Sequence, residues 1–139
     1  NFSRLLSNQL HHLNFIKPCD EEKLIAISSQ HHIGLAVEPG FSLNNQIALS
    51  NKLFTYLLAG NALILSNTPA QQLFYKQYPE VGWCYHSGDS KALASILQQA
   101  HKNVNMLENK RQIAWQLACT QLNWETEKET FLKLVKTVT

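Results

Sequence analysis

The sequence predicts an α/β fold: a Rossmann-like parallel sheet with crossover helices and a helical C-terminal tail. The first observation is that short apolar runs of strand length alternate with helical stretches, which implies parallel strands joined by helices. The second is that Ile33–Val37 and Ala62–Leu65 are apolar throughout, as in strands buried on both faces of a parallel sheet. A length of 139 residues fits one domain, so residues 1–139 are treated as one unit.

The first elements are read from caps and apolar runs. Asp20 can cap a helix that begins with Glu21 and Glu22, since the helix dipole favours acidic side chains in the first turn. This helix is expected to end near Ser29. Around it we expect a helical segment at 2–10, a strand at 13–16, a strand at 33–37 and a loop from 38 to 49.

The middle of the chain carries clear helix signals. Ser50 is a good N-cap for a helix over 51–59, and Gly60 is placed to end it in a left-handed conformation. The strand at 62–65 follows. Thr68 and Pro69 begin the next helix, with Gln71 expected to complete a capping box.

The last part of the chain is mostly helical. A strand at 81–85 leads through a turn at 87–89 into helices at 90–102, 105–121 and 124–135, the last capped by Asn123. Trp115 and Trp124 are expected to be core or docking residues rather than platforms for stacked bases. A doubly wound domain would normally supply a strand before the one at 13–16, so we expect the domain's first β-α unit to be lacking.

Composition excludes several classes of protein. The net charge is +2 with scattered basic residues, so neither a nucleic-acid partner nor a membrane surface is indicated. No apolar run approaches the ~18 residues of a membrane span, so we expect no integral membrane segment. Cys19, Cys84 and Cys119 are too far apart for a disulfide framework or a zinc site, which favours the cytoplasm. The paired histidines do not indicate a metal site.

The binding site is expected beyond the carboxyl ends of the strands. Its strongest candidate is the start of the helix after Ser50, because a helix N-terminus offers unpaired N–H groups that suit a phosphate. Lys52 in the first turn is unfavourable with the helix dipole unless an anion lies nearby; the alternative is a solvated lysine. The segments expected along this edge are Lys17-Pro18, the loop from Glu38 to Leu49, Ser66-Asn67 and His86-Ser87.

Several other residues near this edge have two readings. Thr55 shares a helix face with Asn51, and its hydroxyl can meet a ribose or bond to its own helix backbone. Glu38 can accept hydrogen bonds from sugar hydroxyls, or it is a surface residue. Gly40 suits a loop that approaches a ligand closely, although such residues are common in any surface loop.

The segment Ser50-Asn51-Lys52-Leu53-Phe54-Thr55-Tyr56-Leu57-Leu58-Ala59-Gly60-Asn61-Ala62-Leu63-Ile64-Leu65-Ser66 resembles a glycosyltransferase signature. In the large retaining "group 1" class with the GT-B architecture, the pattern is Lys-Leu/Ile-Phe-Glu-Tyr-Leu/Met-Ala-Ala-Gly-x-Pro-Val-Ile. Four further segments resemble other parts of the family, and they occur along the chain in the same order as in the family: 15–22, 32–35, 88–93 and 123–125. Glu38-Pro39-Gly40-Phe41 echoes the family's Glu and Gly-Phe-Gly with a longer loop, and Thr55 stands where the signature has Glu.

This resemblance implies the donor-binding half of a glycosyltransferase. The nucleotide-sugar donor would be bound without a metal or other cofactor, and an N-terminal acceptor-binding domain would be missing, so the chain alone is expected to be inactive. The alternative is a degenerate glycosyltransferase-like scaffold or partner-binding module. The resemblance implies donor contacts at Glu38, Gly40, Phe41, Ser50, Asn51, Lys52 and Thr55, nucleotide contacts at Lys17 and Pro18, and no catalytic residue within the chain.

Overall fold

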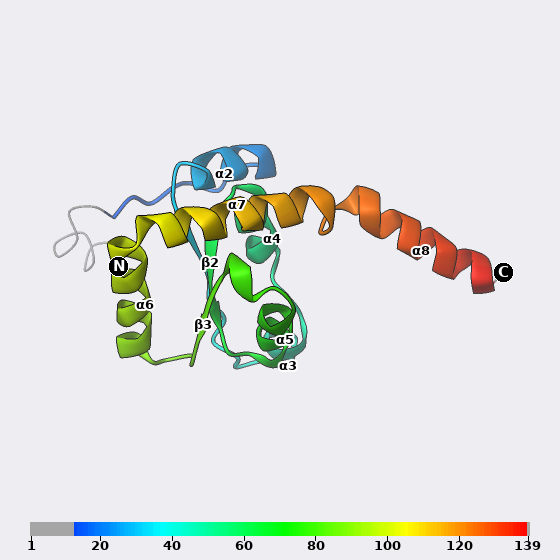
Figure 1. The fold of residues 1–139 in the computed structure, drawn as a ribbon. Coiled ribbons are helices and arrows are strands. Elements are labelled where there is room, and N and C mark those ends of the chain that lie inside the picture. The colour runs from blue at the N-terminus through cyan, green and yellow to red at the C-terminus, as the bar shows by residue number, and fades with distance from the viewer. Residues whose placement is uncertain (1–12, 139) are drawn as a thin grey trace.

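A computed structural model describes residues 13–138 and is built on a three-stranded parallel sheet. β1 (Ile33–Ala36), β2 (Ala62–Ser66) and β3 (Gly82–Tyr85) lie in the order β1-β2-β3, so their order in space follows the chain (Figure 1). All the pairing is parallel, with Ile33 opposite Ala62 and Leu63 opposite Gly82. The helices are α2 (Glu21–Ser28), α3 (Leu43–Ile47), α4 (Asn51–Leu58), α5 (Pro69–Gln77), the 3-10 turn η1 (Pro79–Val81), α6 (Ser90–Lys102), α7 (Val104–Thr120) and α8 (Trp124–Val138).

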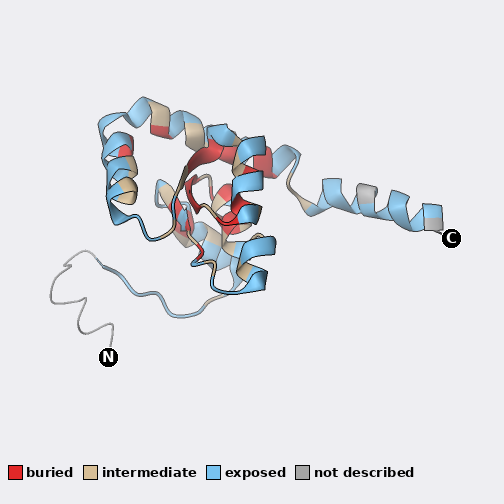
Figure 2. Ribbon diagram, turned by 90° about the horizontal axis from the view of Figure 1, so that it is seen from below, coloured by how far each residue is buried: buried red, intermediate tan, exposed pale blue. Residues whose placement is uncertain are grey.

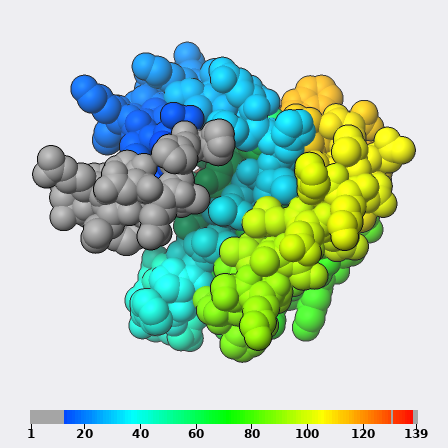
Figure 3. Space-filling view, turned by 90° about the vertical axis from the view of Figure 1, so that its left-hand side faces the viewer, coloured from blue at the N-terminus to red at the C-terminus, as the bar shows by residue number. Residues whose placement is uncertain are grey.

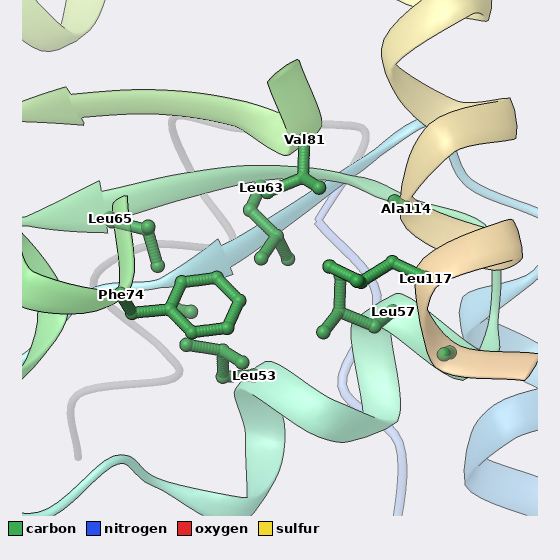
Figure 4. Packing of buried hydrophobic residues seen from close by; sticks show 10 residues of the cluster. Leu53, Leu57, Leu63, Leu65, Phe74, Val81, Ala114 and Leu117 are labelled. Atoms are coloured by element: carbon green, nitrogen blue, oxygen red, sulfur yellow. The ribbon is translucent and has the colours of Figure 1, made fainter. Parts of the chain in front are cut away.

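Helices cover both faces of the sheet, which confirms the α/β class and is compatible with a Rossmann-like arrangement. Every residue of the central strand β2 is buried. Its Leu63 and Leu65 belong to a core shared with α4, α5 and α7, which Figure 4 shows at close range. Ala62 and Ile64, which alternate with them, belong to a second core with α6 and the start of α7.

The C-terminal helices form the expected tail. α7 crosses the sheet and contacts α4, whereas α8 extends away from the body of the molecule (Figure 1). Most of α8 is exposed, as the pale colour in Figure 2 shows. The expectation that the two tryptophans lie in the core is wrong, because Trp115 and Trp124 are 56% and 66% exposed.

The expected strand at residues 13–16 is wrong. These residues form no regular element, and Phe15 and Ile16 are more than half exposed. An apolar run becomes a strand only where a neighbour accepts and donates its backbone hydrogen bonds. Among the described strands β1 pairs with β2 alone, so its other side is a sheet edge, and there Leu35 is 44% exposed rather than buried. Figure 3 views this side, where the cyan segment containing β1 reaches the surface between α2 and α6.

Most of the expected helix boundaries are confirmed, with two differences. Asp20 caps α2 by accepting from Lys23 N–H at 2.8 Å, and Gly60 follows α4 at a φ of 68°. The expected loop at 38–49 contains the short helix α3, which Ser42 caps. The capping box is wrong, because Thr68 makes no side-chain cap bond and Gln71 bonds elsewhere. The expected helix at 2–10 lies outside the described residues.

Candidate functional site

The carboxyl ends of the three strands meet in a network of polar groups. After β1, the Glu38 N–H donates to the Ser66 hydroxyl at the end of β2, at 2.8 Å. After β3, the Ser87 N–H donates to Asn67 Oδ1 at 2.9 Å, and its hydroxyl donates to the Glu38 carbonyl at 3.4 Å. Three of the four expected segments therefore lie together. Lys17 and Pro18, from the fourth segment, are exposed in the irregular stretch before α2, and no described hydrogen bond joins them to this network.

Lys52 sits in the first turn of α4 and is held by two oxygens. Its Nζ lies 2.8 Å from Glu38 Oε1 and donates to the Val37 carbonyl at 2.8 Å. The anion that the sequence required near this lysine is thus present within the chain, because the Glu38 carboxylate offsets the unfavourable helix dipole. The Lys52 side chain remains 39% exposed, whereas that of Glu38 is 10% exposed.

The surroundings of Glu38 favour its ionised form. The hydrogen bond from Lys52 lowers the pKa of this carboxyl, and burial opposes that effect by raising it. The Lys52 charge and the amide of Asn45, whose Nδ2 donates to Oε2 at 3.0 Å, lower the pKa further. The nearby Ser50 hydroxyl also lowers it, although that hydroxyl is buried without a hydrogen bond of good geometry. The net effect is a pKa below the ordinary value of 4.5.

Replacing Lys52 is expected to reduce stability in a way that depends on pH. Lys52→Met should lower the free energy of unfolding by about 1 kcal/mol at neutral pH, because the buried Glu38 loses its strongest partner. The folded-state pKa of Glu38 lies below its unfolded value, so the pair stabilises fully above pH 4.5 and its contribution is lost as the pH falls through the lowered pKa. Urea denaturation at neutral pH and at a series of acid values measures this difference.

Lys91→Met is the matched control for this prediction. Lys91 is the second residue of α6, as Lys52 is of α4, but it is exposed and forms no ion pair with any described residue. Its replacement should leave stability unchanged within about 0.5 kcal/mol at every pH. Equal losses in the two variants, or an unchanged acid dependence in Lys52→Met, would contradict the assigned role of the pair.

Two hollows open beside this ion pair. One, of about 480 Å³, lies between α2 and α4 and is lined by Cys19, Glu21, Leu24, Asn51, Phe54 and Thr55. Thr55 is 7% exposed and its hydroxyl donates to the Asn51 carbonyl at 3.2 Å. Of the two alternatives for this hydroxyl, the structure therefore shows the bond to its own helix backbone. The other, of about 330 Å³, is lined by Pro39, Gly40, Gln46, Asn67, Thr68, Pro69 and Ser87.

The remaining expected residues differ in their surroundings. Gly40 has a φ of 69°, a conformation that favours glycine, and its carbonyl accepts from Gln46 Nε2 at 3.0 Å. Phe41 is 92% exposed. Ser50 occupies the N-cap position of α4 without making a side-chain cap bond. In the described part of the chain no three His, Cys, Asp or Glu residues lie close enough to hold a metal ion.

A larger apolar groove extends from the start of α4 to the start of α8. Its volume is about 900 Å³, and Leu49, Phe54, Leu58, Phe74, Tyr78, Leu122 and Trp124 supply its apolar wall. Only Asn51 and Phe54 are shared with the hollows beside the ion pair. The polar network and the helix N-terminus, rather than this groove, supply the groups that suit a charged ligand.

Sequence reasoning missed two residues of the network, Ser66 as a hydrogen-bonding group and Gln71. Both are fully buried, and Gln71 joins the ends of β1 and β2. The local signal at Gln71 pointed to a cap for α5, so its long-range role carried no separate signature.

Within residues 13–138, no helix is both long and apolar enough to cross a bilayer.

Comparison with known proteins identifies no relative. No family model, no curated protein and no solved structure matches the chain.

Proposed function

We propose that this chain is the donor-binding half of a GT-B glycosyltransferase and binds the diphosphate of a nucleotide-sugar at the N-terminus of α4. The observation that carries this proposal is the position of Lys52. It lies in the first turn of a helix, at the carboxyl edge of a parallel sheet, with its side chain 39% exposed. The resemblance of residues 50–66 to the glycosyltransferase signature points to the same helix.

The groups at this helix end suit an anion. Ser50 makes no side-chain cap bond, and in the first turn of α4 the Leu53 N–H already donates to the Ser50 carbonyl at 3.0 Å. The N–H groups of Asn51 and Lys52 therefore keep their donors for a ligand. The Lys52 ammonium has three N–H bonds and uses two of them, on Glu38 and Val37. Its third N–H is available to a phosphate oxygen. Stabilising the charge of a leaving diphosphate in this way requires no metal.

The proposal covers more than this chain. The acceptor would be bound by an N-terminal domain. The first β-α unit of the donor-binding domain would cover the open side of β1, where Leu35 is exposed. The full enzyme would work in the cytoplasm, and this chain alone would not transfer sugar. Thr55 would supply at most one hydroxyl contact to the ribose where the family's Glu supplies a carboxylate, so that contact would be weaker.

A second candidate is a degenerate glycosyltransferase-like scaffold. The observation that favours it is that Glu38 already neutralises Lys52, so this end of the sheet is satisfied without a ligand. The Thr55 hydroxyl is likewise satisfied by the Asn51 carbonyl. In this case the fold would be retained for a partner protein and no nucleotide would bind.

A titration with uridine and guanosine diphosphates, followed by ¹⁵N NMR, separates the two candidates. We expect one of the nucleotides to shift the amide signals at the start of α4, from Asn51 to Thr55. Lys52→Met should abolish these shifts, whereas Lys91→Met should leave them unchanged. Amide signals of α4 that stay unmoved at millimolar concentrations of both nucleotides would reject donor binding and favour the scaffold.

A further inference from the structure

A side-chain amide bonds to the end of the hydrogen-bond ladder between β1 and β2, at the carboxyl edge of the sheet. At the start of the ladder the Ala62 N–H donates to the His32 carbonyl at 2.9 Å. Bonds in a parallel ladder use alternate residues of each strand, so the next donors on β2 are Ile64 and Ser66. With Ala36 paired to Leu65, the acceptor expected for Ser66 N–H is the Ala36 carbonyl.

The side-chain amide of Gln71 bonds to both of these groups. The Ser66 N–H donates to Gln71 Oε1 at 2.7 Å, and Gln71 Nε2 donates to the Ala36 carbonyl at 2.5 Å. One side-chain amide therefore ties the last backbone groups of the two strands together.

Gln71 is also connected to the ion pair. It is fully buried near the start of α5, where an amide without partners would be costly. Its Oε1 accepts a further bond, from the Ser66 hydroxyl at 2.8 Å. That hydroxyl has one proton, which it gives to Gln71, and its lone pair accepts the Glu38 N–H at 2.8 Å. A continuous chain of hydrogen bonds thus runs from Gln71 through Ser66 to Glu38, whose carboxylate holds Lys52.

We propose that Gln71 is a positioning residue, whose amide ties the ends of β1 and β2 together and, through the Ser66 hydroxyl, fixes Glu38 and hence Lys52. The role in ligand binding rests on the donor-binding function proposed above. Gln71 is completely buried and touches no ligand itself. It acts by holding the strand ends together and by setting the direction in which the Glu38–Lys52 pair presents its free N–H.

The arrangement can be tested first in the unaltered chain. Scalar couplings across hydrogen bonds identify the acceptor of each backbone N–H in a chain labelled with ¹³C and ¹⁵N. We expect the Ser66 nitrogen to couple to the side-chain carbonyl carbon of Gln71. The absence of this coupling would overturn the proposal.

The effect on Glu38 is tested by substitution. Gln71→Met keeps the length of the side chain without its hydrogen bonds, so the Ser66 coupling should be lost and the pKa of Glu38 should rise toward its ordinary value. Gln72→Met, at an exposed neighbour in α5, should change neither. Gln71→Glu should restore the unaltered Ser66 coupling while its buried carboxyl is protonated, because that form keeps one donor and one acceptor.

A purely structural role for Gln71 predicts a different result. It would let Gln71→Met reduce stability while the titration of the Glu38 carboxyl stayed unchanged, and that result would overturn the proposal. If Gln71→Met fails to fold, Ser66→Ala carries the test. It leaves the coupling from residue 66 to Gln71 in place but removes the link to Glu38, so only the Glu38 titration should move. An unmoved titration in Ser66→Ala would equally overturn it.

The ligand measurement keeps the two proposals separate. If the unaltered chain binds a nucleoside diphosphate, Gln71→Met should bind it more weakly than Gln72→Met does. If the unaltered chain binds neither nucleotide, the donor-binding function fails. The couplings of Ser66 and the titration of Glu38 then still decide whether Gln71 positions the ion pair.

Discussion

Gly82→Ala is expected to lower the free energy of unfolding by about 3 kcal/mol or more, enough to leave much of the chain unfolded. Gly82 begins β3 opposite Leu63 of the fully buried β2. A Cβ added there would lie 1.9 Å from the Leu63 carbonyl oxygen and 2.7 Å from its carbonyl carbon. These are backbone atoms of the central strand, so the clash is relieved only if the two strands move apart. Urea denaturation followed by circular dichroism measures the loss.

Gly88→Ala is the control that separates a steric clash from backbone strain. Gly88 has a φ of 88°, so alanine there costs about 1 to 2 kcal/mol for the left-handed conformation. No atom outside its chain neighbours lies within 4 Å of the added Cβ. Gly82 has the opposite combination, since its φ of 174° is ordinary extended backbone. The explanation is contradicted if Gly88→Ala proves the more damaging of the two.

The parts of the fold that depend on nearby residues were predicted from the sequence. The apolar run at 62–65 identified the central strand, because a segment apolar at every position must be covered on both faces. Asp20 and Asn123 were identified as caps because their side chains reach N–H groups three residues along the same chain. Gly60 was placed at the end of α4 for a similarly local reason.

The parts of the fold that depend on distant residues were not predicted from the sequence. The run at 13–16 has the composition of a strand, but pairing is decided by whether another strand lies beside it. Gln71 stands where a capping box would place it, yet its amide bonds to the ends of two strands instead. The amide bonds to the strand ends rather than capping α5, because it is fully buried and an unmade hydrogen bond costs more there than at the exposed start of a helix.

The candidate site was predicted in outline for the same reasons. The carboxyl edge followed from parallel topology alone, and Lys52 was singled out because a cation in a first turn needs a nearby anion. The sequence could not say which anion this is. Glu38 and Lys52 come together because the loop after β1 returns over the end of the sheet. That return depends on hydrogen bonds of Glu38 to Ser66 and Ser87 and is not encoded in either residue's neighbours.

Leu57→Ala is expected to lower the free energy of unfolding by about 2 to 5 kcal/mol. Leu57 is completely buried on the face of α4 that packs against the sheet, and Figure 4 shows it beside Leu63 and Leu117. Leu63 belongs to β2 and Leu117 to α7, so the side chain joins three elements. Truncation removes the contacts and leaves a cavity that these elements close only in part. The transition midpoint in urea should fall while its slope stays unchanged.

Leu58→Ala tests whether this loss comes from burial rather than from the helix itself. Leu58 is the next residue of α4 and is 39% exposed, so its truncation should cost about 1 kcal/mol or less. Both variants replace leucine by alanine in the last turn of one helix, which makes their change in helix propensity the same. A difference between them therefore measures packing. Because α4 also carries Lys52, the stability that Leu57 provides is what holds the helix N-terminus against the ends of the strands. Equal losses in the two variants would show that α4 is not anchored through this core.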